Sequence, residues 1–346
     1  MDIQKLINLV TGFLILAFVL VVALFATSVT MVVNPDAFKD NDLAVSKPVE
    51  KPWAPKNPFT DLSSASEEVQ YGYQLLAETP AHIGPAAERP EMRFAGNNLA
   101  CKNCHLGSGT QAGSASWVGV ANRFPQFRGR ENKIGTLEER INGCMERSMN
   151  GKVLPDDSKE MQAMIAYMEW LSEDVPADQE ARYKGFPKVA IPDYAADPEK
   201  GKTIYVAQCQ VCHAEDGQGI RLAGTDSVKG YQYPPLWGND TYNHGAGMNR
   251  VLTAAQFIKG NMPFGATVDN PILTDEEAYH VAAYIDSFDR PLKSNPEADF
   301  PDKKLKPVST PYGPWEDDFS AEQHKYGPFP PIIAFYKEKY DIKKTK

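Results

Sequence analysis

The pentapeptide CKNCH at residues 101–105 decides how this chain is interpreted, and a second copy of its pattern, CQVCH, stands at residues 209–213. Cys-x-x-Cys-His is the attachment site of a c-type haem, because the two thiols bond the ring and the adjacent His binds iron. A zinc site is the alternative, but neither copy has the second pair of ligands that such a site needs. The sequence predicts two covalent haem c groups. Their protein ligands are expected to be Cys101, Cys104, His105, Cys209, Cys212 and His213.

Length, charge and cysteine count narrow the function. The 346 residues suffice for two domains with extensions, and the net charge of -9 argues against nucleic acid as a partner. Four of the five cysteines belong to the haem motifs, which leaves Cys144 alone. An unpaired thiol in an oxidising compartment is a liability, so Cys144 needs a task.

The amino-terminal segment is apolar. No charged residue occurs from residue 6 to residue 35, a length sufficient to cross a bilayer as a helix. A cleavable signal peptide is the alternative, but its apolar region is usually shorter and ends in a small-x-small site that this chain matches poorly. We therefore expect a retained transmembrane anchor at residues 1–35 and a proline-rich spacer at residues 36–62. Because c-type haems are attached outside the bacterial inner membrane, the remainder is expected in the periplasm.

Each haem motif lies between two predicted helices. The first copy has helical patterns at residues 66–79 and 157–172. In the second copy Asp197 caps a helix that leads into the haem motif, and a further helix is predicted at residues 274–288. The loop before the last helix is longer in the second copy.

Helix, haem motif, loop and helix is the order found in class I cytochrome c domains, which this chain resembles twice. The expected fold is mainly α, with two such domains in tandem after one transmembrane helix. Domain 1 is expected at residues 63–173, a linker at 174–196, domain 2 at 197–290 and an extended carboxy-terminal strap at 291–346. The prolines of the last segment favour an extended course over a third domain.

Met262 is the predicted distal ligand of the second haem. It precedes Pro263 shortly before the final helix, where cytochrome c domains usually place a thioether ligand. Met248 is the competing candidate. A backbone carbonyl within residues 233–237 is expected to orient the His213 ring through its second nitrogen. His/Met ligation raises a haem potential, which suits a site of electron exit.

The corresponding position of the first copy is Met145, the neighbour of Cys144. The repeat cannot choose between them, and the otherwise unexplained thiol favours Cys144. A thiolate is a strong iron ligand that lowers the haem potential and stays a nucleophile when it leaves the iron. An inert buried Cys144, or ligation by Met145, are the alternatives.

Basic residues surround this sulfur. Seven stand between residues 121 and 152 against four acidic ones, in a chain that is acidic as a whole. The basic residues are Arg123, Arg128, Arg130, Lys133, Arg140, Arg147 and Lys152. Guanidinium groups bind oxyanions bidentately, so the cluster indicates an anionic substrate. The alternative is a solvent-exposed loop without a binding role, whose charges pair with one another.

Long motifs in this region resemble one family. WVGV at 117–120, TLEERINGC at 136–144, ERSMNG at 146–151 and PLWG at 235–238 are similar to dihaem thiosulfate dehydrogenase, also called tetrathionate reductase, and the similarity spans residues 66–332. The resemblance implies that Cys144 is the axial ligand of a catalytic first haem, that Arg130, Arg140 and Ser148 line the substrate site, and that Met262 binds the second haem. Some members carry Lys at the position of Asn261, where it can replace Met as a ligand, and many lack an anchor.

The expected activity is therefore the interconversion of two thiosulfates with one tetrathionate and two electrons. A cytochrome or membrane redox partner is expected to exchange electrons with the second haem. Two other hypotheses remain. One is a tethered dihaem carrier without catalysis, and the other is a Sox-type cytochrome that conjugates thiosulfate to a carrier protein. Turnover of either substrate without a carrier protein separates the first hypothesis from both others.

Overall fold

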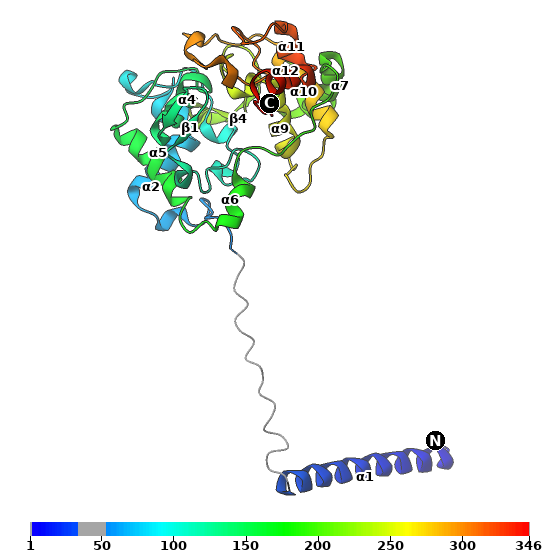
Figure 1. Cartoon of the computed structure of the whole chain (residues 1–346). Helices are drawn as coiled ribbons and strands as arrows, with labels where there is room; N and C mark the ends of the chain where they lie inside the picture. The colour runs from blue at the N-terminus through cyan, green and yellow to red at the C-terminus, as the bar shows by residue number, and fades with distance from the viewer. Residues whose placement is uncertain (1, 34–52, 346) are drawn as a thin grey trace. The chain divides into compact units, whose positions relative to one another are not determined.

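The computed structural model describes residues 2–33 and 53–345 and divides into two units, Met1–Ala54 and Pro55–Lys346 (Figure 1). The first unit is the helix α1 (Ile3–Val33), whose described side chains are almost all exposed. Residues Ile3–Val29 have a mean hydropathy of 2.9, and the helix is long and apolar enough to cross a membrane. A signal sequence has the same properties. Most of the predicted spacer lies outside the described residues.

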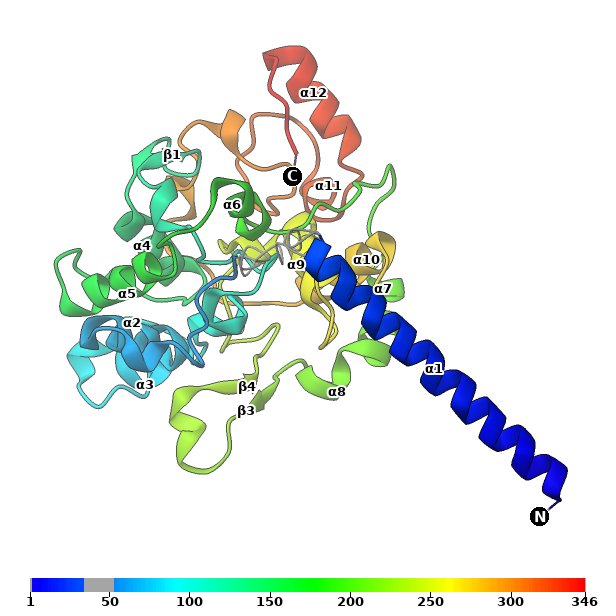
Figure 2. The same ribbon diagram turned by 90° about the horizontal axis from the view of Figure 1, so that it is seen from below.

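The second unit contains the helix pair that the repeat predicts, twice. Helix α2 (Glu67–Ala77) packs against α5 (Lys159–Trp170), and α7 (Pro198–Gln208) packs against α10 (Asp275–Ser287), as Figure 2 also shows. All four predicted helices are confirmed within a few residues. Asp197 caps α7 as predicted, because its Oδ1 accepts hydrogen bonds from the backbone of the first turn.

Both pairs cross at a glycine. A Cβ atom on Gly72 would lie 1.9 Å from the backbone oxygen of Ala163, and one on Gly201 would lie 2.0 Å from that of His280. Any side chain there would push the helices apart, so the two glycines permit the same close crossing in each copy. The equivalent contacts show that the copies are repeats of one architecture.

The expected loop between haem motif and last helix is instead partly helical in each copy. Domain 1 has α4 (Leu137–Arg147) and domain 2 has α9 (Val251–Asn261). The local reason for α4 is a capping box, in which Thr136 accepts from the backbone of Glu139 and the Glu139 carboxylate accepts from that of Thr136. Cys144 therefore lies on a helix.

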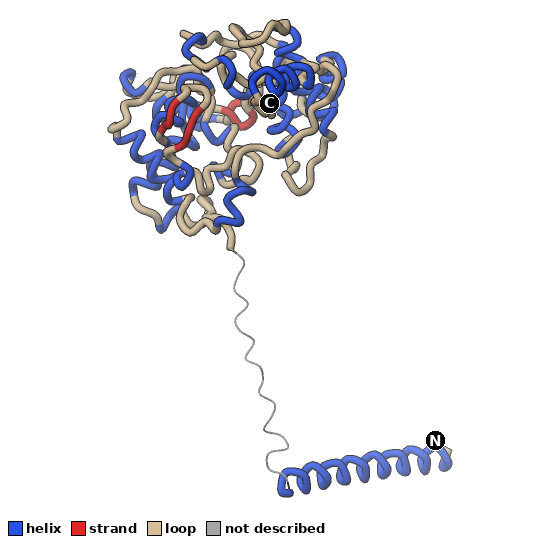
Figure 3. Tube along the Cα trace, viewed as in Figure 1, coloured by secondary structure: helices blue, strands red, loops and turns tan. Residues whose placement is uncertain are grey.

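Strands are few in the described part of the second unit (Figure 3). The hairpin of β1 (Gln126–Arg128) and β2 (Lys133–Gly135) precedes α4, and β3 (Ile220–Arg221) pairs with β4 (Tyr231–Tyr233) in domain 2. The remaining α-helices are α3 (Thr79–Ile83), α6 (Ala177–Tyr183), α8 (Gln210–His213), α11 (Ala321–Tyr326) and α12 (Pro330–Tyr340). Helix α6 lies within the expected linker.

The sequence analysis expected an extended carboxy-terminal segment. Two helices, α11 and α12, lie in it instead. Two prolines in the first turn start α12, where the missing N–H groups cost nothing. Ile332 and Tyr336, one turn apart, are buried in the hydrophobic core of domain 2 together with Val308 and Phe329. The segment therefore completes the core of the second domain.

A buried polar seam joins the two cytochrome-like domains. The side chain of Asn97 donates to the backbone oxygen of Thr241, and that of Asn261 donates to the backbone oxygen of Gly113. Each amide is at most 3 % exposed. Because a buried amide needs its partners, the seam fixes the relative position of the domains and of the sites they carry.

Candidate haem and substrate sites

A cavity of about 260 Å³ lies between the first haem motif and α4, mostly in domain 1 but with Tyr242 and Met248 of domain 2 on its lining. The predicted residues Cys101, Cys104, His105, Cys144, Arg140 and Ser148 all line it. Apolar side chains form much of the rest, including Trp117, Met145, Met149, Met164 and Met168. The structure thus brings several predicted groups together around one cavity. They are the two cysteines of the haem motif, the predicted axial ligands His105 and Cys144, and the predicted substrate residues Arg140 and Ser148.

The ring of His105 is oriented through one of its nitrogens by a backbone carbonyl. Its Nδ1 lies 2.8 Å from the backbone oxygen of Ala115, and the indole of Trp117 packs against it at a centroid distance of 4.8 Å. A hydrogen bond from Nδ1 to a carbonyl leaves Nε2 as the ligand nitrogen and fixes the orientation of the ring. This is the second-sphere contact expected of a haem ligand.

The surroundings of Cys144 favour its thiolate form. Burial raises its pKa, but the positive charge of Arg140 and a hydrogen bond with His105 outweigh burial and lower the pKa to about 5. Nη1 of Arg140 lies 2.7 Å from Sγ. The contact with His105 brings the sulfur and the histidine ring together, and ligation of iron by Cys144 stays a prediction. Met145 also borders the cavity, but it is only 1 % exposed and belongs to the hydrophobic core.

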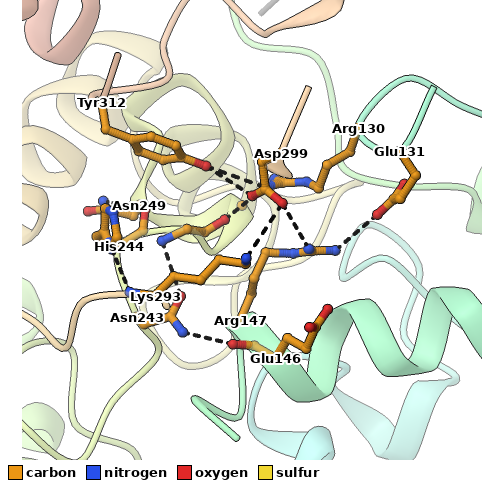
Figure 4. A network of polar contacts seen from close by, with 12 residues as sticks. Arg130, Glu131, Glu146, Arg147, Asn243, His244, Asn249, Lys293, Asp299 and Tyr312 are labelled. Carbon is orange, nitrogen blue, oxygen red and sulfur yellow. Dashed lines mark hydrogen bonds and ion pairs between the residues drawn. The ribbon is translucent and has the colours of Figure 1, made fainter. Parts of the chain in front are cut away.

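Arg130 lies beside the cavity rather than on its lining. It stands in the turn between β1 and β2, where its Nη1 donates to Asp299 Oδ2 at 2.5 Å and to the backbone oxygen of Gly245 at 3.1 Å. Arg147, from the last turn of α4, donates to the other oxygen of Asp299. The predicted substrate residues are therefore divided between the cavity and an adjoining network of charges (Figure 4).

In the second haem motif, too, a backbone carbonyl orients the histidine ring. His213 Nδ1 lies 2.8 Å from the backbone oxygen of Pro234, which confirms the predicted carbonyl within residues 233–237. Met262 directly follows α9 and packs against the core of domain 2 together with Cys209. Met248 packs against that core too, but it also lines the cavity of domain 1. The choice of Met262 over Met248 as the distal ligand stays a prediction.

The donor set fits haem c at both motifs. All five cysteines are free, so no disulfide competes for the thiols that a haem needs. In each motif Nδ1 of the histidine lies at hydrogen-bond distance from a carbonyl, so Nε2 is the nitrogen that would bind iron.

Comparison with known proteins agrees with this geometry. Residues 92–177 match the family model described as SoxA/TsdA, cytochrome c domain, and residues 198–289 match that described as cytochrome c. The thiosulfate dehydrogenase of Stutzerimonas stutzeri is 40 % identical over 237 residues, which cover 68 % of this chain and 72 % of that protein. The one from Allochromatium vinosum is 41 % identical over 237 residues, 67 % of this chain and 82 % of that protein. The chain belongs to the thiosulfate dehydrogenase family.

A solved structure of a thiosulfate dehydrogenase (TsdBA) from Marichromatium purpuratum, in its "as isolated" form, is also similar. Its TM-score is 0.59 at 32 % identity, over 69 % of this chain and 50 % of that chain. Membership in the thiosulfate dehydrogenase family, whose members are oxidoreductases acting on sulfur compounds, and the two matched cytochrome c domains confirm the prediction of two haem c cofactors.

Sequence reasoning missed Asp299, which contacts two arginines of the predicted basic cluster. Asp299 lies in the segment after domain 2, yet its carboxylate is the acceptor shared by Arg130 and Arg147. No motif or periodicity marks a single Asp in a proline-rich stretch, so no local signal could have found it. Arg147 stood in the predicted basic cluster, but its burial at 7 % exposure could not be read from the sequence.

Proposed function

We propose that the chain oxidises thiosulfate to tetrathionate, and that the same site runs the reverse reaction when electrons are supplied. Two thiosulfates form one tetrathionate through a bond between their outer sulfur atoms, and two electrons are released. The observation that carries the proposal is the pair of Cys144 and Arg140 on the cavity of the first haem motif. Haem at that site would supply a one-electron acceptor beside the sulfur.

Arg140 suits an anionic substrate. Its guanidinium donates to the Cys144 sulfur, and no carboxylate lies within ion-pair distance of it among residues 53–345. The Ser148 hydroxyl also reaches the cavity and makes no hydrogen bond within that range of the chain. Both groups are therefore free to donate to sulfonate oxygens, and charge-assisted hydrogen bonds are the strong ones.

Cys144 offers a route to the new sulfur–sulfur bond. The thiolate and the outer sulfur of one thiosulfate form a bond and release two electrons, for which bound haem would be the acceptor. A second thiosulfate then attacks the outer sulfur of the adduct, which releases tetrathionate and restores the thiolate. The mutual repulsion of two dianions opposes this reaction, so Arg140 lowers the barrier by neutralising charge where the anions meet.

Electrons are proposed to leave through the second haem, with His213 and Met262 as its ligands. Val211, inside the second haem motif, is 81 % exposed, and Phe264, two residues after Met262, is 87 % exposed. Exposed apolar side chains beside a redox site suit transient docking of a redox partner. Helix α1 is proposed as a retained anchor in the inner membrane, with the haem domains in the periplasm.

Turnover without a carrier protein tests the proposal. Purified protein holding both haems should oxidise thiosulfate with an artificial acceptor and reduce tetrathionate with a reduced donor. Cys144→Ala should keep both haems but lose nearly all turnover in both directions. Cys144→Met, which restores a sulfur ligand without a thiolate, should not recover it. If the wild type carries two reducible haems and turns over neither substrate, the chain is a tethered electron carrier instead.

A further inference from the structure

Asp299 is the centre of a buried cluster of cations. Its carboxylate accepts from Arg130 Nη1 at 2.5 Å, from Arg147 Nη1 at 3.3 Å and from the Tyr312 hydroxyl at 3.1 Å, and Lys293 Nζ lies 3.9 Å away (Figure 4). The side chains of Asp299, Lys293 and Arg147 are 6 %, 7 % and 8 % exposed. Buried like charges repel strongly, and two carboxylates hold these cations together: Asp299, and Glu131, whose Oε1 lies 3.3 Å from Arg147 Nη2.

The residue after Asp299 holds the same arginine from two further directions. The backbone N–H of Phe300 donates to the backbone oxygen of Arg130 at 2.7 Å. Its ring lies under the Arg130 guanidinium at 4.8 Å. Asp299 and Phe300 thus fix both the main chain and the side chain of Arg130.

Phe300 adopts a strained backbone in doing so. Its φ is +58°, the left-handed region that a bulky residue rarely occupies, and the side chain is 4 % exposed. Such strain persists only where surrounding contacts over-determine the conformation, and it is concentrated at functional sites. From this conformation Phe300 makes both of its contacts with Arg130.

The contacts leave a specific edge of Arg130 unoccupied. Every side-chain hydrogen bond of Arg130, to Asp299, Gly245 and Tyr312, starts from Nη1. Among the described residues 53–345, none starts from Nε or Nη2. These two N–H groups form one of the planar forks with which a guanidinium binds an oxyanion bidentately.

We propose that Asp299 is a positioning residue of the substrate site. It fixes Arg130 by Nη1 so that the Nε/Nη2 edge is presented to a sulfonate group of thiosulfate or tetrathionate, and Phe300 locks that arrangement from the strap. Arg128, Arg130, Arg147 and Lys293 against Asp299 and Glu131 leave two positive charges that such a dianion would neutralise. The inference rests on the proposed function, and it makes residues 299–300 of the carboxy-terminal segment part of the site.

Steady-state kinetics of the full-length holoprotein with thiosulfate test this, in a double-mutant cycle of Asp299→Asn and Arg130→Gln. Glu297→Gln is the matched control, because it removes an exposed carboxylate from the same segment. Asp299→Asn should lower kcat/KM by about 10- to 100-fold, the order expected of a misplaced binding group. Glu297→Gln should behave as wild type. In the Arg130→Gln background, Asp299→Asn should cause almost no further loss, because the two residues act as one unit.

Haem content, the absorption spectra of both haems and the urea midpoint are recorded for each variant, so that a folding defect is seen directly. The inference is overturned if Asp299→Asn keeps wild-type kinetics. It is also overturned if all variants hold both haems and the fold loss in kcat/KM of the double variant equals the product of the two single losses. A wild type with two haems but no turnover overturns the proposed function, and this inference with it. Wild-type turnover together with a silent Asp299→Asn overturns this inference alone.

Discussion

Arg140 and Cys144 lie one turn apart on α4, and Nη1 of the arginine donates to the cysteine Sγ at 2.7 Å. The spacing of four residues in a helix puts both side chains on one face, so the contact is built into a single element. The same helix is fixed at its start by the Thr136 capping box. The sulfur proposed as catalytic and its counter-charge are thereby held on one helix, without help from a loop.

Arg140→Gln should reduce kcat/KM for thiosulfate by on the order of 100-fold, the usual effect of losing one charge-stabilising donor from an active site. The kcat/KM of Arg140→Lys should lie between those of wild type and Arg140→Gln, because lysine keeps the charge but lacks the planar pair of N–H donors. Steady-state kinetics at matched haem content measure both. Lys152→Gln removes an exposed cation from the same basic stretch and should have little effect. Equal losses in Arg140→Gln and Lys152→Gln would reduce the role of Arg140 to general electrostatics.

Much of this site could be predicted from the chain. The haem motifs and the lone Cys144 are local patterns, and the helices that carry them follow from capping and periodicity. The loop assigned before the last helix is the instructive failure, because the Thr136 and Glu139 pair that starts α4 was available in the sequence. Asp299 is different: its partner Arg130 is 169 residues away, and only tertiary packing brings them together.

Asn261→Ala should lower the free energy of unfolding by about 1–3 kcal/mol, the usual result of leaving buried polar groups unsatisfied. The amide of Asn261 donates to the backbone oxygens of Gly113 and Phe257 and accepts from Gln111. Urea unfolding of the haem-loaded protein measures the change. Asn270→Ala, at an exposed position, is the control and should be neutral. A neutral Asn261→Ala would show that the seam does not hold the domains together.

The stability of the chain should depend on Lys306 at alkaline pH. Burial at 2 % exposure, with the charge of Lys303 nearby, lowers the pKa of Lys306 from 10.5 to about 8. The unfolded chain therefore binds more protons than the native chain between about pH 8 and 10.5, so the contribution of this group to stability rises with pH across that window. The contribution of Lys306 to stability is least favourable below pH 8, because the folded chain must then bury a charged ammonium group.

Lys306→Met removes that titration. The stability of the variant relative to wild type should be most favourable near pH 7 and should decline by roughly 2–3 kcal/mol as the pH rises through the window. Urea unfolding at several pH values from 7 to 10.5 measures the difference. Lys304→Met, in the same segment, is the control for the other titrating groups. A difference between Lys306→Met and wild type that does not change with pH would show that Lys306 is protonated equally in both states.

Asp317 is expected to hold the end of the chain on domain 2. Its carboxylate lies 2.9 Å from His324 Nε2 and accepts from the Tyr336 hydroxyl at 2.7 Å, and the side chain is fully buried. The ring of Trp315 stacks on His324 at 4.4 Å. Helices α11 and α12 thus both contact the preceding part of the strap at the Asp317 carboxylate.

Asp317→Asn should destabilise the chain by about 3 kcal/mol, because an amide cannot accept from both partners as a carboxylate does and leaves buried donors unpaired. The neighbouring Asp318→Asn, which is exposed, should change stability by less than about 0.5 kcal/mol. Chemical unfolding measures both, and limited proteolysis should release the carboxy-terminal helices sooner in Asp317→Asn. Because Asp299 lies on the same strap, Asp317→Asn should also lower turnover near its unfolding midpoint, but not well below it. A loss of turnover under fully native conditions would mean that the terminal helices act on the site directly and not only through stability.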